Sequence, residues 1–316
     1  MSDERTPTGA HPADAAPPHC LGRVNRAIDF IRADLSRTPS LEDLARAACV
    51  SPFHFHRVFR SIVGETPAQF TRRLRLEHSV TLMTRDPERA LTSIALDCGF
   101  ASSSDFSRAF KQHYGMPPSA FDVEAWRVER RDELERLMQA GGATVHVEAT
   151  KVEENPDGFE VTIRDMPPRK VAYRRVLDPF REGAVTAAAD SLVEWARAEG
   201  LEGGAWYGYM WEDPDVVPLA DCRYDVAVEC LEFPDRATTP EDVGFFEFAA
   251  MKVAEVGMDA GIDVEMRLLD WIYRQWLPTS GFVPDDQPCF EAWVGLPFAH
   301  GFDRFELAIQ LPVRKA

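Results

Sequence analysis

The amino-acid sequence predicts two domains of different class: an all-α N-terminal domain of two helix-turn-helix units joined by a linker helix, and an α+β C-terminal domain built from a duplicated strand-helix-strand-strand module with a central groove. Three observations predict this arrangement. The 316 residues are enough for two domains of about 100–200 residues each. Apolar residues recur at helical spacing in the first part of the chain, whereas extended runs alternate with helices in the second. The charge also differs between the two parts of the chain. Residues 20–131 carry 17 Lys and Arg and 13 Asp and Glu, whereas residues 132–316 carry 17 Lys and Arg and 36 Asp and Glu.

Composition excludes several classes of protein. Hydrophobic residues make up 45% of the chain and charged residues 28%, which excludes a wholly disordered chain. No apolar run approaches the roughly 20 residues of a membrane span, and the N-terminus lacks a basic-then-apolar signal segment. The six cysteines stand singly, with no C-x-x-C pair and no histidine at metal-ligand spacing. We therefore expect a cytoplasmic protein that contacts no membrane and holds no metal, cofactor or disulfide.

The net charge of −17, taken alone, argues against a nucleic-acid-binding protein, because binding to phosphates needs Lys and Arg. That average is misleading, since the first domain is net positive and the second strongly negative. We expect the two halves to have different partners, and the acidic half to disfavour anionic ligands.

Composition also predicts the boundaries. Residues 1–19 are rich in Pro, Ala, Thr and Asp without an apolar period, which predicts a disordered tail. Residues 139–158 contain Gly-Gly and Asn-Pro and predict a linker. The N-terminal domain is therefore expected at 20–138 and the C-terminal domain at 159–316.

Consecutive helices are predicted in the N-terminal domain. Apolar residues at helical spacing predict a first helix over about 24–35. A second helix begins after Ser40. Ser51 is a good N-cap for a third helix, which ends at Gly64, and Pro67 opens a longer linker helix.

A ten-residue motif occurs twice in this domain. SPFHFHRVFR, beginning at Ser51, returns as SSSDFSRAFK, beginning at Ser102, with the shared pattern S-x-x-x-F-x-R-x-F-[RK]. The glycine that follows recurs at the same offset, as Gly64 and Gly115. Each motif follows a short helix with a small residue, so each copy is expected to form a helix-turn-helix.

Core and surface positions separate in the same way in both copies. The phenylalanines lie four residues apart and are expected to pack on the preceding helix. Arg57 and Arg108 lie roughly on the opposite side, where an arginine can reach a guanine edge or a phosphate. A lone helical arginine is ordinarily a solvated surface group, but its repetition at a fixed register favours DNA binding. Two such helices could enter major-groove segments about one turn, roughly 34 Å, apart.

Three stretches carry this pattern: LEDLARAACVSPFHFHRVFRSIVGETPAQF, the linker helix LRLEHSVTLM, and SIALDCGFASSSDFSRAFKQHYGMPPSAF. Together, over about residues 22–121, they resemble the AraC/XylS family of transcription regulators. The resemblance implies recognition helices at about 52–62 and 103–113. The residues expected to contact DNA are Phe53, His56, Arg57, Arg60, Ser103, Ser104, Ser107, Arg108 and Lys111.

The C-terminal domain is predicted to alternate strands and helices. The expected elements are two extended runs around Pro167 and Pro168, a helix over 183–199, strands at 206–211 and 224–231, a strand run over 245–256, a helix over 262–276, and strands at 289–294 and 304–312. The run RYDVAV at 223–228 matches RFELAI at 304–309, and the order strand, helix, strand, strand occurs twice. Two such modules side by side leave a groove, which is a natural small-molecule site.

A carboxylate and a set of aromatic residues are the candidate ligand contacts. By the two-residue period of a strand, Glu291 shares a face with Cys289 and Trp293. A carboxylate facing aromatic side chains is costly to bury without a partner and attracts a desolvated cation; the alternative is a solvated strand glutamate. Aromatic residues are more often core than ligand contacts, but six of the seven tryptophans lie in this domain. The candidates are Glu291, Tyr209, Trp211, Tyr224, Trp276 and Trp293.

The stretches GYMWEDPDVVPLADCRYDVAVEC, WIYRQWLPTSGF, PCFEAWVG and FELAIQLPV resemble the GyrI-like effector-binding domain over nearly all of 159–313. In multidrug-responsive regulators with this domain, a glutamate in a P-x-[FY]-E strand binds cationic, lipophilic compounds, and Glu291 occupies that position. The resemblance also implies Tyr209 and Trp276 as wall residues. The sequence departs from it at RRVLDPF, where many relatives have a Gly-containing run.

These expectations combine into a one-component transcription regulator that is not an enzyme. Its expected partners are promoter DNA and a small amphipathic ligand, cationic or neutral and lipophilic, with RNA polymerase as a further candidate. Ligand binding would shift a population between DNA-binding arrangements. Two alternatives stay open. Some GyrI-like domains hydrolyse strained cyclopropane-bearing toxins, and Glu291 with Tyr209 could serve as base and orienting group. The acidic domain could instead bind a protein partner.

Overall fold

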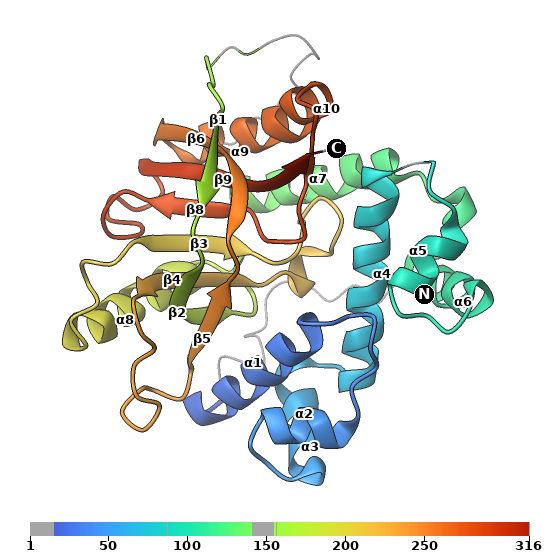
Figure 1. Cartoon of the computed structure of the whole chain (residues 1–316), viewed down its shortest axis with the longest axis horizontal. Coiled ribbons are helices and arrows are strands. Elements are labelled where there is room, and N and C mark those ends of the chain that lie inside the picture. The colour runs from blue at the N-terminus through green and yellow to red at the C-terminus, as the bar shows by residue number, and fades with distance from the viewer. Residues whose placement is uncertain (1–15, 87, 141–154, 156, 316) are drawn as a thin grey trace. The chain divides into compact units, whose positions relative to one another are not determined.

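The computed structural model describes residues 16–86, 88–140, 155 and 157–315. Most of the predicted tail and of the predicted linker lie outside these residues. The described chain forms two compact units: a helical unit up to Phe121 and an α+β unit from Asp122 onward, apart from the short segments Met83–Pro87 and Thr239–Asp242. In Figure 1 the helical unit runs from blue to green and the sheet from yellow-green to red. The predicted fold class is confirmed for both units.

Short helices build the first unit. They are α1 (Pro18–Arg32), α2 (Leu41–Ala47), α3 (Pro52–Val63), α4 (Pro67–Arg85), α5 (Leu91–Asp97), α6 (Ser103–Tyr114) and the 3₁₀ turn η2 (Pro118–Ala120). The helix pairs α2–α3 and α5–α6 are the two predicted helix-turn-helix units, and α4 joins them, as predicted.

The turns inside the two helix pairs need one left-handed residue each. Gly99 fills this position in the second unit with φ of 76°, whereas Cys49 fills it in the first with φ of 55°. In both turns the next backbone N–H donates back into the short helix, from Val50 to Ala45 and from Phe100 to Ala95, each at 3.0 Å. Glycine adopts this conformation without strain, so the second turn is the more relaxed of the two.

Phenylalanines form the core of each helix pair. Phe55 and Phe59 are at most 1% exposed, and their rings lie 5.5 Å apart. Phe106 and Phe110 are fully buried at the same separation. The predicted packing of all four residues is therefore confirmed.

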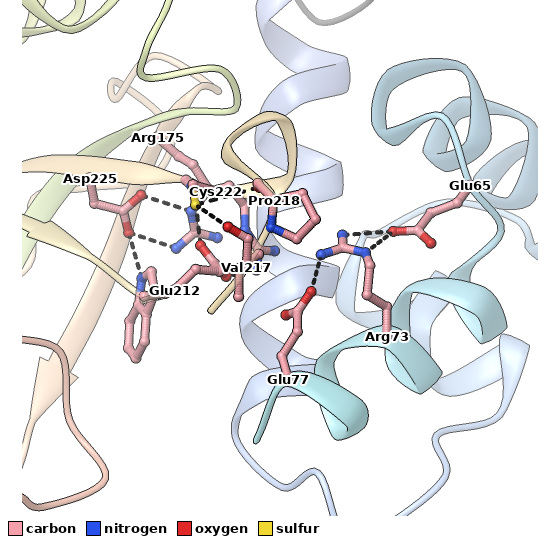
Figure 2. A network of polar contacts seen from close by, with 11 residues as sticks. Glu65, Arg73, Glu77, Arg175, Glu212, Val217, Pro218, Cys222 and Asp225 are labelled. Carbon is pink, nitrogen blue, oxygen red and sulfur yellow. Dashed lines mark hydrogen bonds and ion pairs between the residues drawn. The ribbon is translucent and has the colours of Figure 1, made fainter. Parts of the chain in front are cut away.

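The linker helix α4 carries a buried ion network. Arg73 donates to Glu65 and to Glu77, each at 2.7 Å, and its side chain is only 9% exposed (Figure 2). Arg75 of the same helix donates to the carbonyl of Leu35 at 2.8 Å. These contacts explain why α4 is polar along its length although much of it is buried, since each buried guanidinium has an acceptor.

An antiparallel sheet dominates the second unit. Its strands are β1 (Thr162–Met166), β2 (Arg169–Val176), β3 (Trp206–Met210), β4 (Tyr224–Cys230), β5 (Val243–Phe248), β6 (Met251–Ala260), β7 (Phe282–Pro284), β8 (Phe290–Trp293) and β9 (Phe305–Lys315). The helical elements are α7 (Val123–Ala140), α8 (Ala184–Ala198), the 3₁₀ turn η3 (Leu219–Asp221), α9 (Ile262–Trp271), the π-helical turn η4 (Ile272–Trp276) and α10 (Leu277–Thr279).

Strand order reveals an internal two-fold arrangement. The order is β1-β6-β9-β8-β3-β4-β2-β5, with β7 paired to the end of β9. In the first module β2 pairs with β4 and β4 with β3; in the second, β6 pairs with β9 and β9 with β8. The modules join where β3 pairs with β8. The repeated strand-helix-strand-strand order therefore corresponds to two equivalent halves.

Several element boundaries differ from the prediction. The strand run over 245–256 is two strands, β5 and β6, because the chain turns at 249–250. The helix over 262–276 ends as α9 at Trp271 and continues as η4. β7 and α10 were not predicted, because each is only three residues long.

The two faces of the sheet bury different clusters. Helices α8 and α9 cover one face, where they pack on Trp206, Val226 and Trp293 among others. Tyr173, Tyr209, Phe248 and Phe290 gather on the other face. Because strand side chains alternate, this division decides which of the predicted site residues can meet.

Helix α7 belongs to the second unit. Arg131 of α7 forms ion pairs with Asp215, at 2.6 Å, and with Asp270 of α9. The Trp126 indole donates to the carbonyl of Val216 at 2.9 Å. The sequence predicts that these residues, up to 138, belong to the N-terminal domain. It could not show their contacts with the second unit, because the acidic partners of Arg131 lie more than 80 residues further along the chain.

Candidate functional site

The repeated helices α3 and α6 share one construction. Each has 12 residues, begins after a serine N-cap and ends at a left-handed glycine. The Ser51 hydroxyl accepts from the backbone N–H of His54 at 3.4 Å, and the Ser102 hydroxyl from that of Asp105 at 3.1 Å. The same local signals thus set the start and end of both helices, which fixes the position of the motif residues on each.

The predicted DNA contacts all lie on these two helices. Phe53, Arg57, Arg60, Ser104, Arg108 and Lys111 are exposed, whereas His56, Ser103 and Ser107 are half-buried. Phe53 is 75% exposed, and the Arg57 guanidinium lies 5.9 Å from the centre of its ring. An aromatic residue this exposed has an apolar face available for a partner such as a thymine methyl group.

Arg108 differs from Arg57 in its surroundings. Asp105, in the first turn of α6, accepts from Arg108 at 3.4 Å and from Arg72 of α4 at 3.2 Å. Arg57 has no ion pair among the described residues. The first helix therefore presents a freer guanidinium than the second.

A carboxylate and a phenol meet at the centre of the sheet in the second unit. Glu291 of β8 accepts a hydrogen bond from the hydroxyl of Tyr224 on β4. Gly208 of β3 lies between them, opposite Glu291 in the strand register. A Cβ atom at Gly208 would come within 1.7 Å of the Tyr224 hydroxyl and 2.6 Å of Glu291 Oε2, so the contact requires glycine there.

A second carboxylate lies nearby. Glu265 of α9 is 4% exposed and faces the sheet together with Leu268. Burial, and then repulsion from Glu291, hold the pKa of Glu265 well above its usual range. Burial raises the pKa of Glu291 to about 7, and the Tyr224 hydrogen bond opposes that rise. Burial, followed by these two carboxylates, also raises the pKa of the Cys289 thiol.

Two of the predicted aromatic contacts lie on the same face as Glu291 besides Tyr224. Trp293 is 8% exposed, and its ring packs against Phe298 and Phe305 with ring centres 4.6 Å and 5.2 Å apart. Trp276 packs against the same cluster and stacks on Phe282 with ring centres 6.2 Å apart. The predicted shared face of Glu291, Cys289 and Trp293 corresponds to this arrangement.

Tyr209 and Trp211 do not join Glu291. Both lie on the opposite face of the sheet, because they alternate with Gly208 along one strand. The Trp211 indole donates to Asp225 at 2.9 Å, and Asp225 is held by Arg175 at 2.7 Å (Figure 2). The interpretation of these two residues as ligand contacts beside Glu291 is corrected accordingly, and so is the pairing of Glu291 with Tyr209 as base and orienting group.

Sequence reasoning missed Gly208 and Glu265. Gly208 stands between Tyr207 and Tyr209 in a strand, where a glycine signals a close approach of another group. Glu265 shares a helical spacing with the buried Leu268 of α9 and Ile272 of η4, and this pattern could have placed it on the buried face. Neither signal identifies the neighbours, which depend on pairing between distant strands.

Neither a metal-ligand cluster nor a membrane-spanning helix occurs in the described residues. They contain no group of three or more His, Cys, Asp or Glu side chains placed to hold a metal ion. Nor do they include a helix with the length and hydropathy to cross a membrane.

Comparison with known proteins supports both halves. Residues 44–122 match the family described as a helix-turn-helix domain, and residues 159–314 match the GyrI-like small molecule binding domain. An uncharacterized HTH-type transcriptional regulator, YbfP, of Bacillus subtilis (strain 168) is 36% identical over 98 residues, which are 31% of this chain and 33% of that protein. The XylDLEGF operon transcriptional activator of Pseudomonas putida is 36% identical over 97 residues, 30% of each chain.

A solved transcriptional regulator from Chromobacterium violaceum, with an AraC-type DNA-binding domain, is 25% identical and covers 31% of this chain and 86% of its own, with a TM-score of 0.29. The chain thus spans about a third of the length of the curated relatives above. The chain joins an AraC-type helix-turn-helix domain to a GyrI-like small-molecule binding domain.

Proposed function

We propose that the chain is a transcription regulator whose helical unit binds promoter DNA through α3 and α6, and whose α+β unit binds a small lipophilic cation at Glu291. It acts by binding rather than by catalysis. The observation that carries the ligand half is a carboxylate set among Tyr224 and Trp293, with no cationic side chain paired to it in the described part of the chain.

The desolvation of the Glu291 carboxylate supports a cationic ligand. A half-buried carboxylate without a cation loses part of its hydration and is destabilised, which is why the pKa of Glu291 rises. A lipophilic cation restores the missing charge, and aromatic faces such as that of Trp293 add cation–π attraction. An anion would meet both this carboxylate and the acidic charge of the whole unit.

The exposed residues of α3 and α6 support the DNA half. Both helices present arginine at the same motif position, Arg57 and Arg108. Both begin after an exposed serine N-cap, and the dipole of a helix N-terminus favours a phosphate. The small side chains of α6, Ser103, Ser104 and Ser107, favour backbone contacts over base reading.

Helix α7 offers a route between the two activities. It follows η2 after two residues, and it pairs with Asp270 of α9, the helix that carries Glu265. Ligand binding beside Glu265 would therefore act on a helix that continues directly from the second helix-turn-helix unit.

Fluorescence titration of the full chain tests the ligand half. Tetraphenylphosphonium and tetraphenylborate have nearly the same shape and opposite charge. We expect quenching of tryptophan emission by the cation only, and loss of that quenching in Glu291→Gln. Equal binding of both ions, or full retention in Glu291→Gln, would contradict the proposal.

A further inference from the structure

Glu265 is a buried acid without a cation. It is 4% exposed and lies on the same helical face as the fully buried Leu268 of α9 and Ile272 of η4. Its carboxylate has no hydrogen bond or ion pair in the described part of the chain. An unpaired buried carboxylate is costly, so its retention at this position calls for a function.

The other acids that are at least nine-tenths buried in the described part of the chain all have arginine partners. Glu77 pairs with Arg73 at 2.7 Å, Asp225 with Arg175 at 2.7 Å, and Asp270 with Arg274 at 2.9 Å and with Arg131. Glu212 pairs with Arg223. Among the described residues that are at least nine-tenths buried, Glu265 is the one acid that the fold leaves without a guanidinium.

Glu265 and Glu291 share one apolar surrounding. Glu265 lies on helix α9, and Glu291 lies on strand β8 of the sheet that α9 covers. Leu268, which follows Glu265 by three residues on α9, packs in the same buried cluster as Tyr224 and Trp293, the neighbours of Glu291. Repulsion from Glu291 contributes, after burial, to the raised pKa of Glu265. The nearest polar neighbour that either one bonds is the uncharged hydroxyl of Tyr224.

A ligand with one positive charge neutralises only one of these carboxylates. The other must then stay protonated, which adds no attraction for the ligand, or remain as an unpaired buried charge, which is costly. A ligand with two cationic groups neutralises both, and its apolar spacer replaces water between them.

We propose that the site takes lipophilic dications, with one cationic group on Glu291 and the second on Glu265. The inference rests on the proposed function, because it assigns a second anchoring carboxylate to the same site. Glu265 is thereby a specificity-determining residue: Glu291 sets the preference for positive charge, and Glu265 sets the preference for two charges over one.

Calorimetric titration of the full chain tests this. The probes are α,ω-bis(trimethylammonium) alkanes of increasing length and the alkyltrimethylammonium ions of the same lengths. For the best-fitting length we expect the dication to bind at least about tenfold more tightly than its monocation, and the ratio to fall below about threefold in Glu265→Gln. Glu291→Gln is expected to weaken both probes.

A matched control separates the site from the general negative charge of the unit. Glu194 is exposed on α8, so Glu194→Gln removes the same charge from the surface and is expected to keep the ratio. A wild-type ratio below about threefold at every length, or an unchanged ratio in Glu265→Gln, would overturn the inference. If the monocations bind and the dications bind no better, only this inference fails; if neither class binds, the proposed function fails with it.

Discussion

Arg131 of α7 forms an ion pair with Asp270 of α9, where Asp270 is almost fully buried. The same guanidinium donates to Asp215 at 2.6 Å, and Arg274 approaches Asp270 from its own helix at 2.9 Å. Burial opposes the charge of Arg131, but the two acids outweigh it and raise the pKa of Arg131. Helix α7 is therefore bound to the α+β unit by charge as well as by packing.

Removal of this charge should loosen α7. In Arg131→Met the stem of the side chain is kept and both acids lose a partner, so we expect local opening of α7 to become easier by about 2–4 kcal/mol. Hydrogen exchange of the full chain measures this as faster exchange of amides in 123–134. Arg197→Met is the control, because the Arg197–Glu202 pair is solvent-exposed and exposed ion pairs add little to stability. Unchanged exchange in α7 would show that packing alone holds it.

Local signals made the helical unit predictable. Ser51 and Ser102 mark the helix starts, Gly64 and Gly115 mark the ends, and a fixed offset repeats the whole motif. These signals act within a few residues of the chain and need no knowledge of the fold. The position of α7 was not predictable in this way, because its partners come from distant segments.

The candidate ligand site was predictable only in part. Glu291 and Trp293 share a face by strand alternation, which the sequence contains. That Tyr224 meets Glu291 across Gly208, and that Tyr209 points to the other face, depends on the register of β3 with β8. Register between distant strands is set by tertiary packing. Aromatic composition alone therefore could not separate the residues on the Glu291 face from Tyr209 and Trp211 on the other face.

Substitution of Gly208 should disturb the Tyr224–Glu291 contact. A Cβ atom there overlaps the Tyr224 hydroxyl, and the buried tyrosine has little room to move, so we expect Gly208→Ala to destabilise the fold by about 1–3 kcal/mol. Tetraphenylphosphonium binding should weaken as well. Chemical denaturation and fluorescence titration measure the two effects. Gly257→Ala is the matched control, since nothing lies within 4 Å of a Cβ atom at that strand position; equal effects of both substitutions would contradict the steric account.

The raised pKa of Glu291 predicts how stability depends on pH. Because the folded state holds this proton up to about pH 7, folding takes up a proton between the unfolded pKa and pH 7, and stability falls as pH rises through that window. Glu291→Gln removes the free-energy cost of an ionised carboxylate at this position. We therefore expect the variant to be more stable than wild type by about 1–3 kcal/mol at pH 8 and nearly as stable as wild type at pH 4. Urea denaturation at the two pH values measures this. A variant that is less stable than wild type at pH 8 would contradict an unpaired carboxylate at this position.

The same titration predicts that cation binding depends on pH. A protonated Glu291 carries no charge to attract a cation, so affinity for tetraphenylphosphonium should fall as pH drops from 8 to 5.5, with the decline beginning near pH 7 and continuing below it. In Glu291→Gln, any residual binding should lose this dependence. A wild-type affinity that stays constant over the range would exclude Glu291 as the group that binds the cation.

DNA binding should depend more on Arg57 than on Arg108. Arg57 is exposed and has no ion pair in the described part of the chain, whereas Arg108 must first separate from Asp105. We expect Arg57→Ala to weaken binding by about 1–3 kcal/mol if the guanidinium reads a base, and Arg108→Ala to cost less. The measurement is fluorescence anisotropy with a duplex selected from a random library by the full chain, at physiological salt. Arg46→Ala is the control, because Arg46 is 77% exposed on α2, outside the recognition helices. Unchanged affinity in Arg57→Ala, or an equal loss in Arg46→Ala, would show that α3 does not present Arg57 to the bases.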